Sequence, residues 1–140
     1  MILRCNFEEL GALRKGSSML LGESSVEHAP VVAPPEGREE VEAILPRLTG
    51  DLTMETLADQ RRVLKGVRAI VAHLKEEMDA SVLATHPADE SAVSSYFLYA
   101  HALAVLKRVW GLGQEMEALI EVVTGAPATP KVAGSFRFPS

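Results

Sequence analysis

Apolar residues recur at helical spacing through the middle of the chain, and this pattern predicts a long helix over about 53–84. Intervals of three and four residues place the apolar positions on one side of that helix, and one series repeats every seventh residue, as in a coiled coil. Asp51 and Thr53 are both suitable N-cap residues for its start. The apolar positions are Val63, Leu64, Val67, Ile70, Val71, Leu74 and Met78, with Leu57 as the first member of the heptad series.

A second long helix, over about 87–124, is predicted to contain the most apolar stretch of the chain. Residues 91–106 include no Lys, Arg, Asp or Glu. Pro87 suits the first position of a helix, and Gly125 suits the position just after its end. Because only a few residues separate this helix from the preceding one, the two are expected to form a long antiparallel hairpin.

The second helix has two apolar faces of different length, so neighbours must cover it on more than one side. We expect the longer face to pack against the preceding helix, and the shorter aromatic face to meet the N-terminal helices or a second copy of the protein. Gly111 and Gly113 are expected to mark a kink or a close approach of another backbone. The longer face comprises Leu98, Val105, Val109, Leu112, Met116, Leu119, Ile120 and Val123, and the aromatic face Tyr96, Tyr99, Leu103, Leu106 and Trp110.

Shorter elements are predicted before the hairpin. A helix over about 7–21 has Asn6 at its N-cap position, and glutamates follow in its first turn, where they are favourable. A second helix, over about 36–49, contains Pro46, which predicts an irregular or early end.

The two ends of the chain carry weak strand patterns. Residues 1–5 are mostly apolar and favour a short strand, while Phe136 and Phe138 alternate with polar residues within 135–140. The two segments could pair with each other, and a disordered C-terminal tail is the alternative. The predicted fold is therefore mainly α, or α+β if terminal strands form. We expect a single domain over 1–140, made of an N-terminal helical or mixed segment (1–50), the helical hairpin (51–124) and a tail or short strand (125–140).

Composition narrows the range of partners and compartments. The formal net charge of −5 favours solubility and places nucleic acid last among the partners. A basic stripe on the first long helix is better explained as a solvated face, or one paired with acidic residues such as Glu39, Glu40 and Glu42, than as a phosphate-binding surface. The lone cysteine, Cys5, favours a reducing compartment, and a membrane span is not expected, so the predicted location is cytoplasmic. The stripe comprises Arg61, Arg62, Lys65, Arg68 and Lys75.

Little in the sequence points to catalysis. His101 is the one ionisable side chain within the uncharged stretch, either as a core histidine or as a functional group beside Ser94 and Arg108. No triad of nucleophile, base and orienting group can be specified. His73 has helical ligand spacing to Glu76 and Glu77, but exposed surface positions explain these residues better than a metal site.

The favoured function is a non-enzymatic oligomerisation or protein-interaction module, with the protein itself, as a homodimer, or another protein as its partner. The candidate binding residues are aromatic types enriched at interfaces, with His101 added: Tyr96, Tyr99, His101 and Trp110. The first alternative is a small-molecule site, either binding or catalytic, around Tyr99, His101 and Arg108. The second is weak nucleic-acid binding through the basic stripe. No catalytic residue, metal or cofactor is predicted, and the sequence carries no motif by which we recognise a family.

Overall fold

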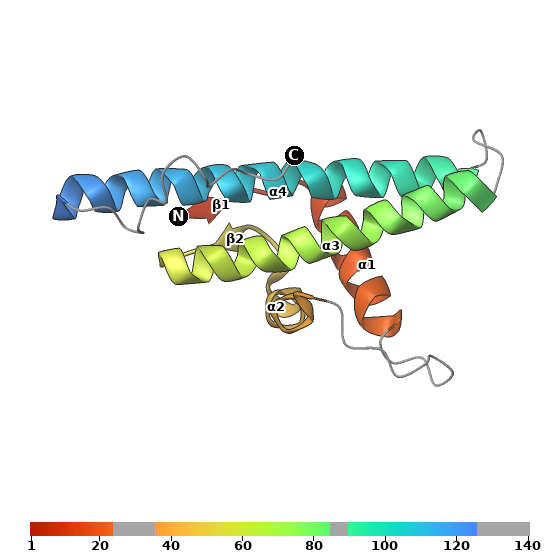
Figure 1. Ribbon diagram of the computed structural model, residues 1–140, viewed down its shortest axis with the longest axis horizontal. Helices are drawn as coiled ribbons and strands as arrows, with labels where there is room; N and C mark the ends of the chain where they lie inside the picture. Colours follow the sequence, from red (N-terminus) through yellow and green to blue (C-terminus); the bar gives the residue numbers. More distant parts are fainter. Residues whose placement is uncertain (24–35, 85–89, 126–140) are drawn as a thin grey trace.

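The computed structural model describes residues 1–23, 36–84 and 90–125, and in these ranges the chain is mainly α, as expected (Figure 1). The described elements include four α-helices, one short 3-10 helix and two very short strands. In chain order they are β1 (Ile2–Leu3), α1 (Phe7–Glu23), α2 (Arg38–Ile44), the 3-10 helix η1 (Leu45–Arg47), β2 (Leu52–Thr53), α3 (Leu57–Ala84) and α4 (Glu90–Thr124).

The two long helices, α3 and α4, lie side by side in antiparallel orientation and form the predicted hairpin (Figure 1). The shorter helices α1 and α2 pack on α3, and α1 also contacts α4. Neither follows the hairpin axis: α1 runs across it, and α2 is seen end-on (Figure 1). The hairpin is therefore covered on one side by α1 and α2.

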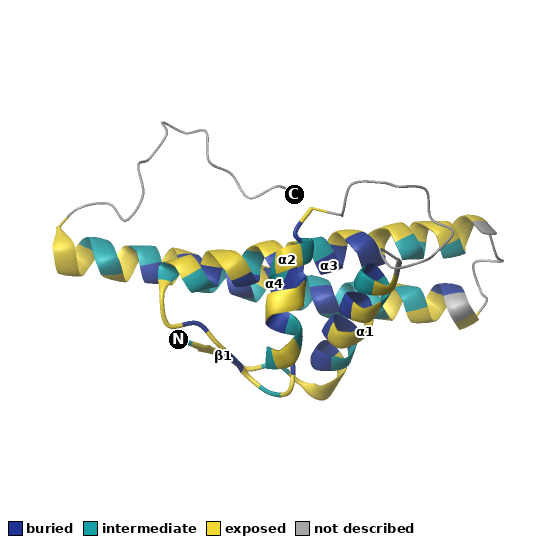
Figure 2. Cartoon of the chain, turned by 90° about the horizontal axis from the view of Figure 1, so that it is seen from below, coloured by how far each residue is buried: buried dark blue, intermediate teal, exposed yellow. Residues whose placement is uncertain are grey.

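One hydrophobic core joins all of these elements. The predicted apolar side of α3 is confirmed, because Val63, Val67, Ile70 and Leu74 are all buried. They pack with apolar residues of the other elements, and in Figure 2 the buried residues of α1, α2 and α3 gather where these helices meet. Buried core residues outside α3 include Leu3, Leu13, Leu20, Val41, Ile44, Leu48, Leu52, Val105 and Val109.

The start of α3 differs from the prediction. The helix begins at Leu57 rather than near Thr53, and its cap is Thr56, whose hydroxyl accepts a hydrogen bond from the backbone N–H of Asp59 at 3.0 Å. Thr53 belongs instead to β2, while the carboxylate of Asp51 accepts a hydrogen bond from the backbone N–H of Cys5. Both residues that the sequence favoured as caps are thus used by contacts with the N-terminal strand region.

The predicted strand at the N-terminus is confirmed as β1, and it pairs antiparallel with β2. Ile2 lies opposite Thr53, and Leu3 lies opposite Leu52. The C-terminal segment that was the expected pairing partner lies outside the described residues. The prediction for Pro46 is also confirmed, since α2 ends at Ile44 and the chain continues as a 3-10 helix through Arg47.

A close approach at Gly113 sets how α3 and α4 lie against each other. A Cβ at this position would be only 2.7 Å from the side-chain Cδ of Gln60 in α3. The neighbouring group is a buried side chain, whereas the sequence suggested either a kink or the approach of another backbone. The amide of Gln60 donates a hydrogen bond of 2.9 Å to the carbonyl of Val109, one turn earlier in α4. An amide of α3 thus occupies the space that a missing side chain of α4 leaves.

Candidate functional site

The longer apolar face of α4 is only partly a core face. Val105, Val109 and Met116 are buried, as expected, but Leu119 and Val123 are 55% and 81% exposed. Their exposure follows from the lengths of the two helices. Arg61, near the start of α3, forms an ion pair with Glu117, so the last two turns of α4 extend past α3 (Figure 1).

On the side of α4 opposite its core face lies a short series of apolar residues in solvent. Val93 and Phe97 are 42% and 54% exposed, and Ala100 and Ala104 are partly exposed. Their alternating intervals of four, three and four residues place them in one line along the helix. We call these four residues the outer seam. Ala102 and Val105, on the other side of the same turns, are fully buried, so α4 is apolar on both sides here.

Charged residues bound the outer seam at both ends. Glu90 precedes it at the start of α4 and Lys107 follows it, and both are exposed. The intervals to the seam are three residues in each case, so the two charges continue the same line. The seam is therefore an uncharged strip that begins at an acid and ends at a base.

Aromatic surface extends the outer seam on one flank. Tyr96 is 56% exposed, and its ring meets the ring of Phe97 edge-on, with centroids 5.7 Å apart. At the same end of the hairpin, Val82 and Leu83 of α3 are also exposed. The hydroxyls of Ser81 and Ser95 lie 3.3 Å apart, which places this end of α3 beside the first turns of α4.

The aromatic face predicted from the sequence is divided by the fold. Tyr96 is exposed, whereas Tyr99 and Leu103 are partly buried against the core and Leu106 is buried. Trp110 is partly buried. Of the predicted binding residues, Tyr96 is thus the one whose ring is most open to a partner.

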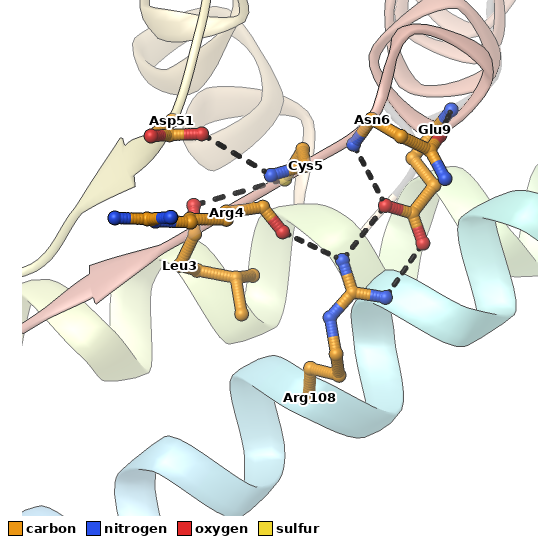
Figure 3. Close-up of polar contacts among 7 residues, drawn as sticks. All are labelled: Leu3, Arg4, Cys5, Asn6, Glu9, Asp51 and Arg108. Atoms are coloured by element: carbon orange, nitrogen blue, oxygen red, sulfur yellow. Dashed lines mark hydrogen bonds and ion pairs between the residues drawn. The ribbon is translucent and has the colours of Figure 1, made fainter.

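Arg108 lies in a cluster of polar contacts with the start of α1 (Figure 3). Its guanidinium donates to both carboxylate oxygens of Glu9, at 2.6 and 2.8 Å, and to the carbonyl of Arg4 at 2.9 Å. Glu9 also accepts from the backbone N–H of Asn6, while the Asn6 side chain accepts from the backbone N–H of Glu9. This reciprocal pair is a capping box, which confirms Asn6 as the cap of α1.

Charge in this cluster is balanced. The Arg108 hydrogen bonds, followed by the one from Asn6, lower the pKa of Glu9 against the opposing effect of its burial. Glu9 in turn raises the pKa of Arg108. Burial raises the pKa of the Cys5 thiol, although Arg108 acts in the opposite direction. The paired acid and base, Glu9 and Arg108, connect α1 to α4 beside the Cys5 thiol.

This geometry bears on the predicted site around Tyr99, His101 and Arg108. His101 and Arg108 are seven residues apart in α4, which places them on the same flank of the helix. Tyr99 is two residues from His101 and points about 160° away on an ideal helix. His101 and Arg108 therefore share one flank of α4, and Tyr99 points away from that flank.

Three of the five residues in the basic stripe of α3 are paired with acidic residues, which is one of the two arrangements expected for this face. Lys65 forms an ion pair of 3.1 Å with Glu40 of α2, which lowers the pKa of Glu40 and raises that of Lys65. Arg61 pairs with Glu117 at 3.5 Å. Lys75 pairs with Asp79 at 3.5 Å. Lys65, Arg61 and Lys75 therefore have carboxylates of the same chain close by.

One hollow lies beside the start of α2, with a volume of about 450 Å³. Most of its charged groups are paired: Arg38 with Glu42 at 3.2 Å, and Lys65 with Glu40. The lining residues are Glu36, Gly37, Arg38, Glu39, Glu40, Glu42 and Lys65.

His73 corrects one expectation from the sequence. It is buried, 9% exposed, beside the core residue Leu74, and does not lie on the helix surface. Its Nε2 atom is 3.9 Å from the carboxylate of Glu77. Within residues 1–23, 36–84 and 90–125, no three His, Cys, Asp or Glu side chains are grouped so that they could hold a metal ion.

Comparison of the chain with protein-family models, with curated proteins and with solved structures finds no match in any of the three. None of the helices in the described ranges is long and apolar enough to cross a membrane. The candidate site therefore rests on the chain's own geometry. The outer seam is the feature that the sequence reasoning missed, although its 93, 97, 100 and 104 spacing is readable in the sequence. It was hidden because the whole stretch is apolar and two other faces account for most of its large residues.

Proposed function

We propose that this protein is a non-enzymatic interaction module that associates with a second copy of itself through the outer seam of α4. The observation that carries the proposal is the exposure of Phe97, Val93 and the neighbouring Tyr96 on a stretch of helix without charge. Large apolar side chains grouped in solvent are typical of interaction surfaces, and aromatic residues contribute much of the binding energy there.

The arrangement of the molecule supports this face over the rest of the hairpin. Helices α1 and α2 already pack on α3, and α1 occupies the Arg108 flank of α4. The outer seam is on the remaining side. Two such hairpins, joined along α4, would give the four-helix arrangement in which apolar helix faces are commonly buried.

The two alternative functions have less support. For a small-molecule site, the guanidinium of Arg108 would have to leave Glu9 and the carbonyl of Arg4. For nucleic acid, Lys65 and Arg61 would have to exchange their carboxylate partners for phosphates, on a chain with a net charge of −5. We therefore retain the interaction module as the single proposal.

Sedimentation equilibrium across the micromolar range tests it directly. The wild-type protein is expected to show a dimer that dissociates on dilution. Phe97→Asp is expected to weaken the dimer at least about 30-fold, because a charge would enter the buried centre of the interface. Circular dichroism of the dilute variant is expected to show an intact helical monomer.

Phe7→Asp is the matched control. Phe7 is also an exposed phenylalanine, 80% exposed, but it lies at the start of α1, outside the outer seam. This variant should dimerise like the wild type. A wild-type protein that stays monomeric throughout the range, or equal effects of the two substitutions, would overturn the proposal.

A further inference from the structure

The order of residues along the outer seam also defines how a second copy would lie. The residues from Glu90 to Lys107 follow the alternating three-and-four spacing of a coiled-coil seam, with Glu90, Phe97 and Ala104 in one set of positions and Val93, Ala100 and Lys107 in the other. In an antiparallel coiled coil, each position of one set faces a position of the other set in the partner.

We propose that two copies pair through α4 in antiparallel orientation, with a two-fold axis crossing the seam between Phe97 and Ala100; this inference rests on the proposed self-association. Phe97 then lies opposite Ala100 of the second copy, and Val93 lies opposite Ala104. Each large side chain meets a small one, so the helices can approach closely without collision of the phenylalanines. A two-fold axis repeats every contact, as an isologous interface requires.

Charge supports the same alignment independently of size. The pairing that places Phe97 opposite Ala100 also places Glu90 opposite Lys107 of the second copy, at both ends of the seam. Both side chains are exposed, and no residue between them carries an acidic or basic side chain apart from His101, which is on the Arg108 flank. A parallel pairing would instead place Glu90 beside Glu90 and Lys107 beside Lys107, with like charges opposed.

The flank of the seam agrees with this register. Tyr96 and Leu103 lie on the same flank, one position before Phe97 and before Ala104. The antiparallel alignment places Tyr96 beside Leu103 of the second copy, so that apolar surface continues past the seam. Tyr96 is 56% exposed in the single chain, and this contact would cover its ring.

Charge reversal tests the register. Glu90→Lys and Lys107→Glu each oppose like charges at two symmetry-related places, and each is expected to weaken the dimer about 5- to 10-fold. The double variant Glu90→Lys with Lys107→Glu restores opposite charges in the antiparallel pairing, and its dissociation constant is expected to return to within about twofold of the wild-type value. Glu76→Lys and Lys15→Glu, at exposed positions of α3 and α1, change net charge equally and should leave the dimer unchanged.

Disulfide formation gives a second, geometric test. In a Cys5→Ser background, the double variant Glu90→Cys with Lys107→Cys should form a covalent dimer under mild oxidation, because the two positions meet across the interface. Each single cysteine should fail, since the antiparallel alignment separates the two copies of residue 90 by about 25 Å along the helix.

These outcomes separate the register from the self-association on which it depends. A monomeric wild-type protein removes both. If Phe97→Asp disrupts the dimer but neither charge reversal changes its dissociation constant, the interface is retained and the register is overturned. Efficient cross-linking of Glu90→Cys alone also overturns the register, in favour of parallel pairing.

Discussion

Arg108 and Glu9 form a doubly hydrogen-bonded ion pair, 2.6 and 2.8 Å long, between residues 99 positions apart in the chain. The same Glu9 completes the capping box of α1 by accepting the backbone N–H of Asn6. One carboxylate therefore stabilises the start of one helix and attaches it to another. Because the Glu9 side chain is 7% exposed, little water is present to replace the partners it would lose.

Glu9→Gln is expected to destabilise the protein by about 1–3 kcal/mol, because hydrogen bonds with charged partners are stronger than neutral ones. Glutamine is similar in shape, so the capping contact with Asn6 and the packing are largely retained. Urea unfolding at neutral pH measures the change. Glu8→Gln, at the neighbouring exposed position, is the control and should change the unfolding free energy by less than about 0.5 kcal/mol.

The pH dependence of the same pair has a defined sign. Arg108 lowers the pKa of Glu9 below its ordinary value of 4.5, so the folded state stabilises the ionised form of this carboxylate. Its contribution is complete above the unfolded-state pKa and is lost as the pH falls through the lower folded-state value. The stability difference between wild type and Glu9→Gln should therefore shrink on acidification below about pH 4.5. A difference in unfolding free energy between wild type and Glu9→Gln that stays constant at every pH would contradict this assignment.

Gly113 and Gly111 are expected to respond oppositely to alanine. Gly113→Ala places a Cβ 2.7 Å from the Gln60 side chain and should cost about 1–2 kcal/mol net, even though alanine favours helix. Gly111→Ala has no atom within 4 Å of the added Cβ and should stabilise the helix by about 0.5–1 kcal/mol. Thermal unfolding at one protein concentration compares the two. In a Gln60→Ala background the penalty of Gly113→Ala should disappear.

The cap of α3 provides a prediction that separates two neighbouring threonines. Thr56→Ala removes the acceptor for the Asp59 N–H and should destabilise the protein by about 1 kcal/mol. Thr53→Ala, in the exposed part of β2, should change stability by no more than about 0.5 kcal/mol. Chemical denaturation of both variants decides which threonine is the cap. The reverse order of effects would place the helix start where the sequence suggested it.

The hairpin could be predicted from the sequence because its signal is local and repeated. Val63, Val67, Ile70 and Leu74 mark the buried side of α3 several times over, so one ambiguous residue could not change the result. Pro46 likewise ends α2 through its own ring, which removes a backbone N–H donor and clashes with the preceding helical turn. Such features need no knowledge of the rest of the chain.

Features that depend on distant partners were missed. Thr53 is the same residue type as the cap Thr56, but it pairs with Ile2 in the two-stranded sheet. The two residues are 51 positions apart, so no local sequence pattern predicts this contact. His73 was expected on the helix surface together with Glu76 and Glu77, yet the packing of α3 buries it. The Glu9–Arg108 pair could not be foreseen either, since each residue alone has the appearance of an ordinary surface charge.

The hydrogen bond from Gln60 to the Val109 carbonyl has a mechanical consequence. The apolar side of α3 is nearly periodic, so packing alone would tolerate a slide of α4 by one helical turn, about 5.4 Å. Such a slide would break the hydrogen bond between the buried Gln60 amide and the Val109 carbonyl. It would also bring the amide against a side chain of α4, because the space at Gly113 would no longer lie beside it. The two helices therefore resist sliding along each other, and the hairpin keeps a constant length. A force on one end would move the hairpin as a rigid unit and would not shift α4 by a turn against α3.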